Sequence, residues 1–199
     1  MREATVNRIT NETDIKLTLR LDCDNVKQRK VTVDTGCGFF DHMLTLFAAH
    51  GGFGLDVTCK GDTYVDFHHS AEDIGICLGQ AFSSALGDCA GIRRYGSIIL
   101  PMDEALVLCA VDVSGRGFLS YETPRLNERI GNFDTELARE FFTSFTRKSM
   151  MTLHIKVLSG ENTHHILEAI FKAAGRAVSA ATELDNRRTG EIQSTKGII

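Results

Sequence analysis

The sequence predicts an α+β protein that consists of one internally duplicated unit. Three observations support this prediction. The motif His-His-x-x-Glu occurs twice, strand-like and helix-like segments follow the same order in both halves, and the halves align at a nearly constant spacing. Ile155 lies 98 residues after Val57, and His164 lies 96 residues after His68. Similarity at a fixed period indicates a repeat. Because two repeats are too few for a solenoid, we expect them to pack against each other as one pseudo-symmetric domain.

The predicted elements run strands, helix, strand, helix in each half. Apolar residues alternate in the predicted strands and recur at helical spacing in the predicted helices. In the first half, about 1–92, we expect strands at 5–10 and 16–22, a helix at 39–53, a strand at 55–62 and a helix at 68–88. In the second half, about 93–185, we expect strands at 104–115 and 117–124, a helix at 135–150, a strand at 152–160 and a helix at 164–183. No linker is visible, so residues 1–199 are expected to form a single domain, with helices covering one face of the sheets and a loosely ordered tail at 186–199.

Composition excludes several classes of protein. The net charge of −4 gives no basic field for nucleic acid. The N-terminus is polar from its start, unlike a signal peptide. The most apolar region, 97–113, is interrupted by Pro101, Asp103 and Glu104, so no membrane span is expected. The six cysteines contain no CxxC pair and are expected to be reduced and mostly buried, which favours the cytoplasm.

The two His-His-x-x-Glu motifs contain four of the seven histidines of the chain. Each residue of a helix advances by about 100°. The second histidine therefore diverges from the first by about 100°, and the glutamate projects between them at about 40°. Two diverging imidazoles are poorly placed to chelate one ion, but they are able to serve two ions. The duplication predicts two metal sites of similar composition, each completed by the other copy, with the ligands His68, His69, Glu72, His164, His165 and Glu168.

Three other residues bear on the metal hypothesis. His42 lies on the helix predicted at 39–53, and the repeat aligns it with Glu140, which is also able to ligate a metal. Asp73 aligns with Ala169, so Asp73 lies outside the shared ligand set and is expected to accept a local hydrogen bond. Imidazole and carboxylate ligands suit Mn, Fe, Zn, Co or Ni. They differ from a thiolate zinc site and from the HExxH pattern of metalloproteases.

Three long motifs, DTGCGFFDHML, GDTYVDFHHSAEDIGICLGQAF and ENTHHILEAIFKAAGRAV, resemble those of imidazoleglycerol-phosphate dehydratase, an enzyme family of histidine biosynthesis. The resemblance extends from RITNET near the N-terminus to STKG near the C-terminus. It implies a hydro-lyase that converts D-erythro-imidazole-glycerol phosphate into imidazole-acetol phosphate. It also implies a duplicated α+β fold of the ribosomal protein S5 domain 2-like type, and a large homo-oligomer, an octahedral 24-mer, with active sites between subunits.

The resemblance further implies two Mn²⁺ ions at each active site. The matching ligands are His42, His68, His69, Glu72, His164, His165 and Glu168. Several relatives have histidine where this chain has Glu140, so either its carboxylate replaces the imidazole or that site is held differently. An imidazolate held between two ions would expel the adjacent hydroxyl through a diazafulvene-like intermediate. The candidate acids and bases are Glu12, Glu72 and Glu168, and the alternative for Glu12 is a plain turn residue.

The phosphate of that substrate requires basic partners. The residues that match the family's substrate-binding positions are Glu12, His50, Arg94, Arg116, Ser194 and Lys196. Guanidinium groups bind phosphate in a bidentate manner, and lysine adds a point charge. Terminal segments are usually poorly ordered, but we expect the tail with Ser194 and Lys196 to order over an active site, including one on a neighbouring subunit.

Two other functions use the same residues. A dinuclear metallohydrolase would use the predicted ligands to activate water. A non-catalytic metal-binding assembly protein would use them to join subunits. The resemblance over the whole chain disfavours the first, and the predicted phosphate-binding residues disfavour the second. Formation of an enolisable ketone from the substrate would distinguish the dehydratase from both.

Overall fold

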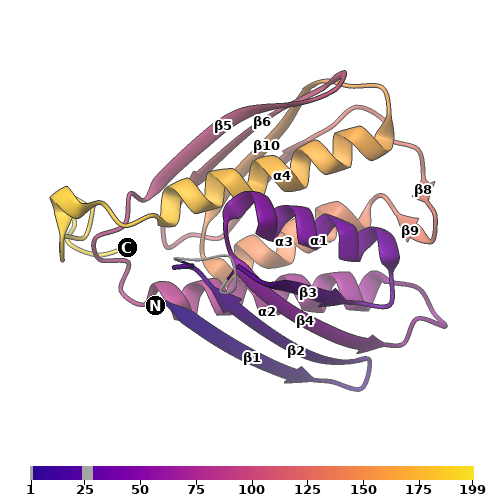
Figure 1. Ribbon diagram of the computed structural model, residues 1–199, viewed down its shortest axis with the longest axis horizontal. Coiled ribbons are helices and arrows are strands. Elements are labelled where there is room, and N and C mark those ends of the chain that lie inside the picture. The colour runs from indigo at the N-terminus through magenta and orange to yellow at the C-terminus, as the bar shows by residue number, and fades with distance from the viewer. Residues whose placement is uncertain (1, 24–28) are drawn as a thin grey trace.

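The computed structural model describes residues 2–23 and 29–199 and contains two four-stranded sheets with four helices between them (Figure 1). The strand order is β1-β2-β4-β3 in the first sheet and β5-β6-β10-β7 in the second. In each sheet only the last pair is parallel. This shared order confirms the predicted duplication and the α+β class. The strands are β1 Glu3–Ile9, β2 Thr13–Arg20, β3 Val31–Asp34, β4 Gly54–Gly61, β5 Tyr95–Met102, β6 Ala105–Asp112, β7 Phe118–Glu122 and β10 Thr152–Ser159.

The helices of the two halves pack against each other between the sheets. They are α1 Gly38–Gly51, α2 His68–Leu86, α3 Leu137–Ser149 and α4 Thr163–Thr182. Helix α2 packs on the first sheet and α4 packs on the second, while α1 lies along α4 and α3 lies along α2 (Figure 1). The first helix of each half therefore packs against the second helix of the other half, and this exchange positions the candidate site. Two short strands, β8 Arg129–Ile130 and β9 Phe133–Asp134, and the 3-10 turn η1 Asn186–Arg188 are the remaining elements of the described residues.

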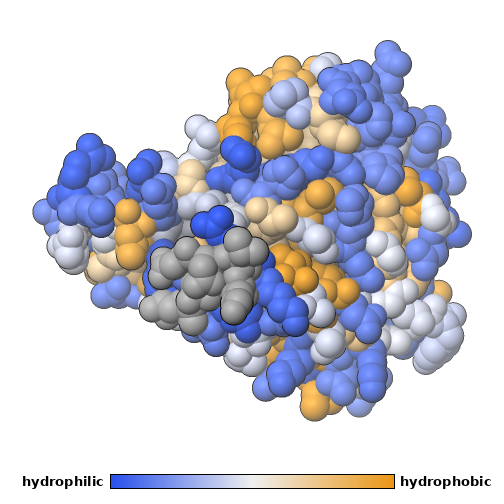
Figure 2. All heavy atoms as spheres, viewed as in Figure 1, coloured by the Kyte–Doolittle hydropathy of each residue, from blue (hydrophilic) through white to orange (hydrophobic). Residues whose placement is uncertain are grey.

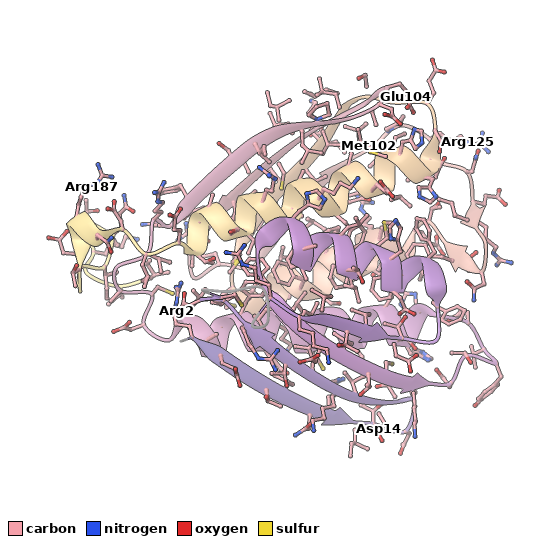
Figure 3. The ribbon with its side chains drawn as sticks, in the orientation of Figure 1. Arg2, Asp14, Met102, Glu104, Arg125 and Arg187 are labelled. Atoms are coloured by element: carbon pink, nitrogen blue, oxygen red, sulfur yellow. The ribbon has the colours of Figure 1, made fainter. Side chains whose placement is uncertain are left out.

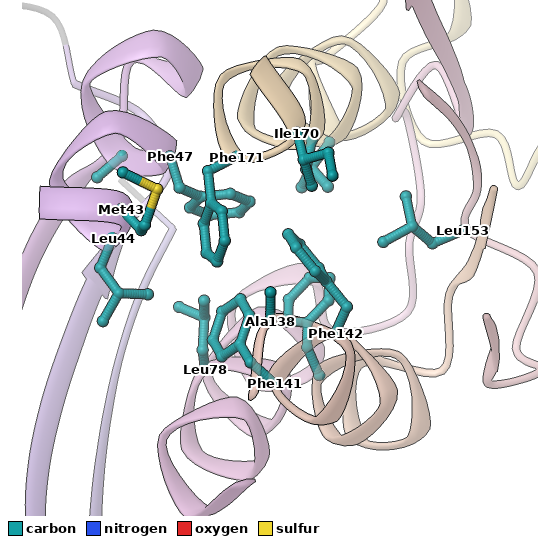
Figure 4. Close-up of a cluster of buried hydrophobic side chains, with 14 of the residues drawn as sticks. Met43, Leu44, Phe47, Leu78, Ala138, Phe141, Phe142, Leu153, Ile170 and Phe171 are labelled. Carbon is teal, nitrogen blue, oxygen red and sulfur yellow. The ribbon is translucent and has the colours of Figure 1, made fainter. Parts of the chain in front are cut away.

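Phenylalanine side chains fill much of the space between the helices (Figure 4). Phe142 of α3 and Phe171 of α4 are fully buried, with ring centroids 4.9 Å apart. Such aromatic pairs contribute about 0.5–1.5 kcal/mol beyond the burial of their area. The sequence predicts Phe40, Phe47 and Phe53 to be core residues, and their burial confirms this.

Glycines permit the close approach within each helix pair. A Cβ atom on Gly79 of α2 would lie 2.5 Å from the carbonyl oxygen of Phe145 on α3. A Cβ atom on Gly175 of α4 would overlap the carbonyl oxygen of Phe47 on α1. The repeat aligns Gly79 with Gly175 and Phe47 with Phe145. The same backbone contact therefore sets the spacing of both helix pairs.

We expect the Gly175→Ala variant to lose about 1–3 kcal/mol of stability, as overpacked sites commonly do. The added methyl group would clash with backbone, which cannot rotate away as a side chain can. Equilibrium unfolding in urea measures the loss. The control is Gly38→Ala, because a Cβ atom at Gly38 meets nothing within 4 Å. Equal stability of the two variants would contradict this account of the helix spacing.

Four strands are not predicted from the sequence: β3 and β5 of the four-stranded sheets, and the two-residue strands β8 and β9. Strand β5 contains Pro101, which has no N–H to donate. It is nevertheless an edge strand, where proline is tolerated. Strand β3 has only four residues, too few for a clear alternating pattern. The strand expected at residue 16 begins three residues earlier, at Thr13.

The cysteines were predicted to be mostly buried, and no helix was expected to span a membrane. Five cysteines are buried and Cys89 is half-buried, as predicted. Burial raises the pKa of the Cys77 thiol to about 12, which keeps it protonated. None of the helices in the described parts of the chain is both long enough and apolar enough to cross a bilayer.

Candidate metal site

Three predicted metal ligands meet at the N-terminal ends of α1 and α4. His42 Nε2 lies 2.8 Å from Glu168 Oε1, and His164 Nε2 lies 3.4 Å from the same oxygen. One ligand atom from each residue lies within 4.8 Å of the other two, and no other three His, Cys, Asp or Glu residues among those described approach so closely. Asn162 fixes the first turn of α4 by accepting hydrogen bonds from the backbone N–H groups of His164 and His165.

Glu168 is buried, but its carboxylate is ionised. Burial by itself raises the pKa of this carboxyl group, and hydrogen bonds from Lys172 and His42 outweigh that effect and lower the pKa to about 2. Lys172 Nζ lies 2.7 Å from Glu168 Oε2. Metal ligation needs the deprotonated carboxylate. An ionised carboxylate beside two imidazoles therefore fits a divalent cation.

The first copy of the motif begins helix α2. His69 Nδ1 donates a hydrogen bond to Asp62, 3.0 Å from Oδ2, and this contact raises the pKa of His69. Its other nitrogen, Nε2, lies 3.7 Å from Glu12 Oε1. Glu12 lies in the turn between β1 and β2 with its side chain 52% exposed. The backbone N–H of His68 donates to Asp66, which holds the start of the helix.

The second copy shows a similar arrangement at His165. Its Nδ1 donates to Glu104, 2.8 Å from Oε2, and its Nε2 lies 3.8 Å from Asp103 Oδ2. The contact with Glu104 raises the pKa of His165, and it lowers the pKa of Glu104 to about 2. In both copies the second histidine therefore has Nδ1 bound to a carboxylate.

Glu72 and Glu140 lie on the helix pair α2 and α3. Within the described residues, neither carboxylate forms a hydrogen bond or an ion pair. The repeat places Glu140 in this pair where His42 stands in the pair of α1 and α4. Among the described residues, the structure brings His42, His164 and Glu168 together, but it does not gather His68, Glu72 and Glu140 into an equally compact cluster.

The residues predicted to bind phosphate lie near the tail. Arg94 Nε donates to Asp112 Oδ1 at 2.8 Å, and its Nη1 donates to the carbonyl oxygen of Gln193 at 2.6 Å. Arg94 and Ser194 line one cavity. Arg116 donates to the carbonyl oxygen of Ser114. Lys196 is exposed, and its backbone N–H donates to Ser194 Oγ.

The C-terminal tail and the histidine cluster lie at opposite ends of the folded subunit. Helix α4 has 20 residues, so its ends are about 30 Å apart. His164 lies at one end, and η1 follows the other. Figure 3 shows Glu104 at the histidine end of the molecule and Arg187 at the far end, and Figure 2 shows the tail protruding with mainly hydrophilic side chains. The tail of this chain is therefore distant from its own histidines.

Two further predicted residues have clear surroundings. Asp73 accepts hydrogen bonds from Thr13 at 2.5 Å and from Arg8 at 2.9 Å, which confirms that it is a local acceptor. His50 lies in a groove with Lys172 and Arg176. Burial and these two cations lower the pKa of His50, so its imidazole is neutral at pH 7.

The fold and the site together define a duplicated α+β protein with a candidate metal-binding triad between its halves. The family model for imidazoleglycerol-phosphate dehydratase matches residues 35–178. The chain therefore belongs to the imidazoleglycerol-phosphate dehydratase family, whose members are hydro-lyases of histidine biosynthesis.

Relatives and solved structures agree with this membership. The imidazoleglycerol-phosphate dehydratase of Gluconacetobacter diazotrophicus is 52% identical over 198 residues, which cover 100% of this chain and 98% of the relative. That of Oceanobacillus iheyensis is 51% identical and covers 100% of both chains. The crystal structure from Staphylococcus aureus has a TM-score of 0.82 at 38% identity, covering 92% of this chain and 99% of that one. The structure of the Pyrococcus furiosus protein with (S)-C348 has a TM-score of 0.82 at 36% identity, covering 98% and 100%.

Four charged residues at the site, Asp62, Glu104, Lys172 and Arg176, were not predicted from the sequence. Lys172 and Arg176 follow Glu168 at intervals of four residues. This spacing places all three side chains on the same face of a helix, so it could have indicated that they lie near the metal site. Asp62 and Glu104 have no comparable local signal, because each reaches its histidine from a strand end outside the helix that carries the motif.

Proposed function

We propose that this chain dehydrates D-erythro-imidazole-glycerol phosphate to imidazole-acetol phosphate with two Mn²⁺ ions at each active site. The observation that carries this proposal is the convergence of His42 and His164, from different halves, on the ionised Glu168. Family membership supports the reaction. The nitrogen and oxygen donors support a metal of the Mn²⁺ type.

The repeat suggests how the proposed ligands are divided between the two metal ions. One set is His42, His164 and Glu168, and the equivalent set is Glu140, His68 and Glu72. His69 and His165 diverge from the first histidines of their motifs by about 100°. They are therefore able to complete sites formed with other subunits. Glu140 fits this division as a carboxylate in place of the imidazole of His42.

The bound ions would supply Lewis-acid chemistry and orient the imidazole ring of the substrate. The proton transfers fall to residues of the chain. Glu12 is the first candidate, because its carboxylate is exposed beside His69 and accepts no hydrogen bond from the described residues. It would remove the proton from carbon or return one to the leaving hydroxyl. Glu72 and Glu168 would act mainly as ligands. Neutral His50 would orient a substrate hydroxyl by a hydrogen bond.

We further propose that active sites form between subunits of a large homo-oligomer, the octahedral 24-mer of the resemblance. Arg94, Arg116, Ser194 and Lys196 would bind the phosphate in this arrangement. The roughly 30 Å between the two ends of α4 supports it, because the tail reaches a histidine cluster more readily on a neighbour than on its own chain. Such a soluble biosynthetic enzyme would work in the cytoplasm, without nucleic-acid or membrane partners.

We expect the metal-free protein to be inactive and to regain activity with a plateau near two Mn²⁺ per chain. Titration of the apo-protein, with detection of the ketone product, measures both quantities. The double variant His68→Ala, His164→Ala should neither bind two ions nor turn over. Tight Mn²⁺ binding and assembly without ketone formation would show that the clusters are structural. Hydrolysis of the phosphate without a ketone would favour the metallohydrolase.

A further inference from the structure

The turns of two equivalent hairpins face the histidine motifs. Strand β2 begins at Thr13 and strand β6 begins at Ala105, which is 92 residues later. Strands β1 and β5 also begin 92 residues apart. The same offset aligns Glu12 with Glu104. The two glutamates therefore occupy the same position in the two halves of the molecule.

These equivalent glutamates make different contacts. Glu104 Oε2 accepts the hydrogen bond of His165 Nδ1 at 2.8 Å. Glu12 does not contact the corresponding nitrogen of His69. Asp62 accepts that hydrogen bond instead, and Glu12 faces the opposite ring nitrogen at 3.7 Å. Glu104 therefore accepts a hydrogen bond from its histidine, and Glu12 does not.

Asp62 has no counterpart in the second half, where the aligned residue is Gly160. Its backbone N–H donates to the carbonyl oxygen of Glu12 at 3.0 Å, so it is tied to the same turn. Its side chain is only 13% exposed. The two halves thus bring carboxylates from different positions to the same histidine nitrogen. This recurrence indicates that the contact itself is what the site requires.

Glu104 has a second set of partners that makes its position firm. Its Oε1 accepts hydrogen bonds from the backbone N–H groups of Asn162, at 2.8 Å, and Glu161, at 3.3 Å. Asn162 is the cap of α4. Glu104 therefore fixes both the ring of His165 and the loop that starts its helix.

We propose that Asp62 and Glu104 are positioning residues that hold Nδ1–H of His69 and His165 and so present Nε2 of each ring to a metal ion. This inference rests on the proposed function, in which both histidines are ligands. Metal-binding histidines commonly donate their other N–H to a carboxylate, which fixes the tautomer and the ring orientation. Because Asp62 holds His69, Glu12 is left free for proton transfer, whereas its equivalent Glu104 is not.

Mn²⁺ affinity of the full-length apo-protein tests the proposal without turnover, with free Mn²⁺ measured by electron paramagnetic resonance. Asp62→Ala and Glu104→Gln are expected to weaken binding by about 10–100-fold. Glu104→Gln retains an oxygen for the backbone N–H of Asn162. The controls Asp14→Ala and Glu161→Gln change exposed carboxylates on the same hairpin and loop, and they should bind normally.

Circular dichroism and light scattering establish that each variant is folded and assembled. Normal Mn²⁺ affinity in folded Asp62→Ala or Glu104→Gln protein would overturn the positioning role. His69→Ala and His165→Ala separate this failure from that of the proposed function. If these two variants also bind Mn²⁺ normally, the ligand assignment itself is wrong. If they lose Mn²⁺ while the carboxylate variants keep it, only the positioning role is wrong.

A double-mutant cycle tests whether Asp62, by binding His69 Nδ1, leaves the carboxylate of Glu12 free. In the natural background, Glu12→Gln should reduce turnover and leave Mn²⁺ affinity unchanged. In the Asp62→Ala background, Glu12 should take over His69 Nδ1 in the manner of Glu104, so adding Glu12→Gln should weaken Mn²⁺ binding several-fold further. Non-additive effects of the two substitutions on Mn²⁺ affinity would support the proposal that Asp62 keeps Glu12 away from His69 Nδ1. Additive affinities would overturn it.

Discussion

Replacement of Glu168 by glutamine is expected to lower Mn²⁺ affinity at its site by more than roughly 100-fold, since loss of a supporting partner alone costs about 10–100-fold, and to abolish measurable turnover. The carboxylate is the common acceptor of His42 and His164 and the ion-pair partner of Lys172. A neutral amide would bind the cation weakly and would leave the half-buried ammonium group of Lys172 without its carboxylate partner. Isothermal titration of the apo-variant with Mn²⁺, together with the ketone assay, measures both effects.

A second variant separates the metal role of Glu168 from its role as a counter-ion. The double variant Glu168→Gln, Lys172→Met removes the unpaired ammonium group, so its stability in urea should recover towards that of the natural protein. Mn²⁺ binding should remain lost. Recovery of Mn²⁺ binding together with stability would mean that Glu168 only compensates the charge of Lys172, and the proposed ligand set would then be wrong.

Co-assembly of two inactive variants is expected to restore activity if subunits share sites. One variant lacks residues 194–199, and the other carries Glu168→Gln. In a random one-to-one mixture, half of the sites have an intact metal cluster, and half of these receive an intact tail from a neighbour. About a quarter of the sites would therefore be complete, if each site joins one cluster to a tail across a symmetric interface. Co-expression of the two chains, with purification on two different tags, provides the mixed oligomer for the assay.

Two controls accompany this experiment. Each variant purified alone should be inactive, and light scattering should show that both assemble as the natural chain does. A mixed oligomer with no activity would show that the tail serves the cluster of its own chain. Full activity of the truncated variant alone would remove the tail from the site altogether.

Sequence patterns predicted the repeated parts of the molecule well, because these parts are local. The helices that carry both motifs were confirmed, since their apolar spacing follows from helical geometry. The duplication was confirmed by the strand order, and the burial of Phe40, Phe47 and Phe53 by the core. The edge strand β5 was missed, because Pro101 argues locally against a strand and only the strand order shows that its missing N–H is harmless.

The sequence by itself therefore determined the family, the duplicated α+β architecture and the types of candidate ligand, since motif spacing and periodicity are properties of contiguous residues. Only the tertiary structure decided which of the candidate ligands meet. The exchange of helices between halves joins His42 to Glu168, which lie 126 residues apart in the chain. Only the strand register shows that Glu12 and Glu104 are equivalent, and only the side-chain contacts show that Asp62 binds the histidine Nδ1 in one half whereas Glu104 binds it in the other. These contacts depend on long-range packing, which no local pattern of residues records.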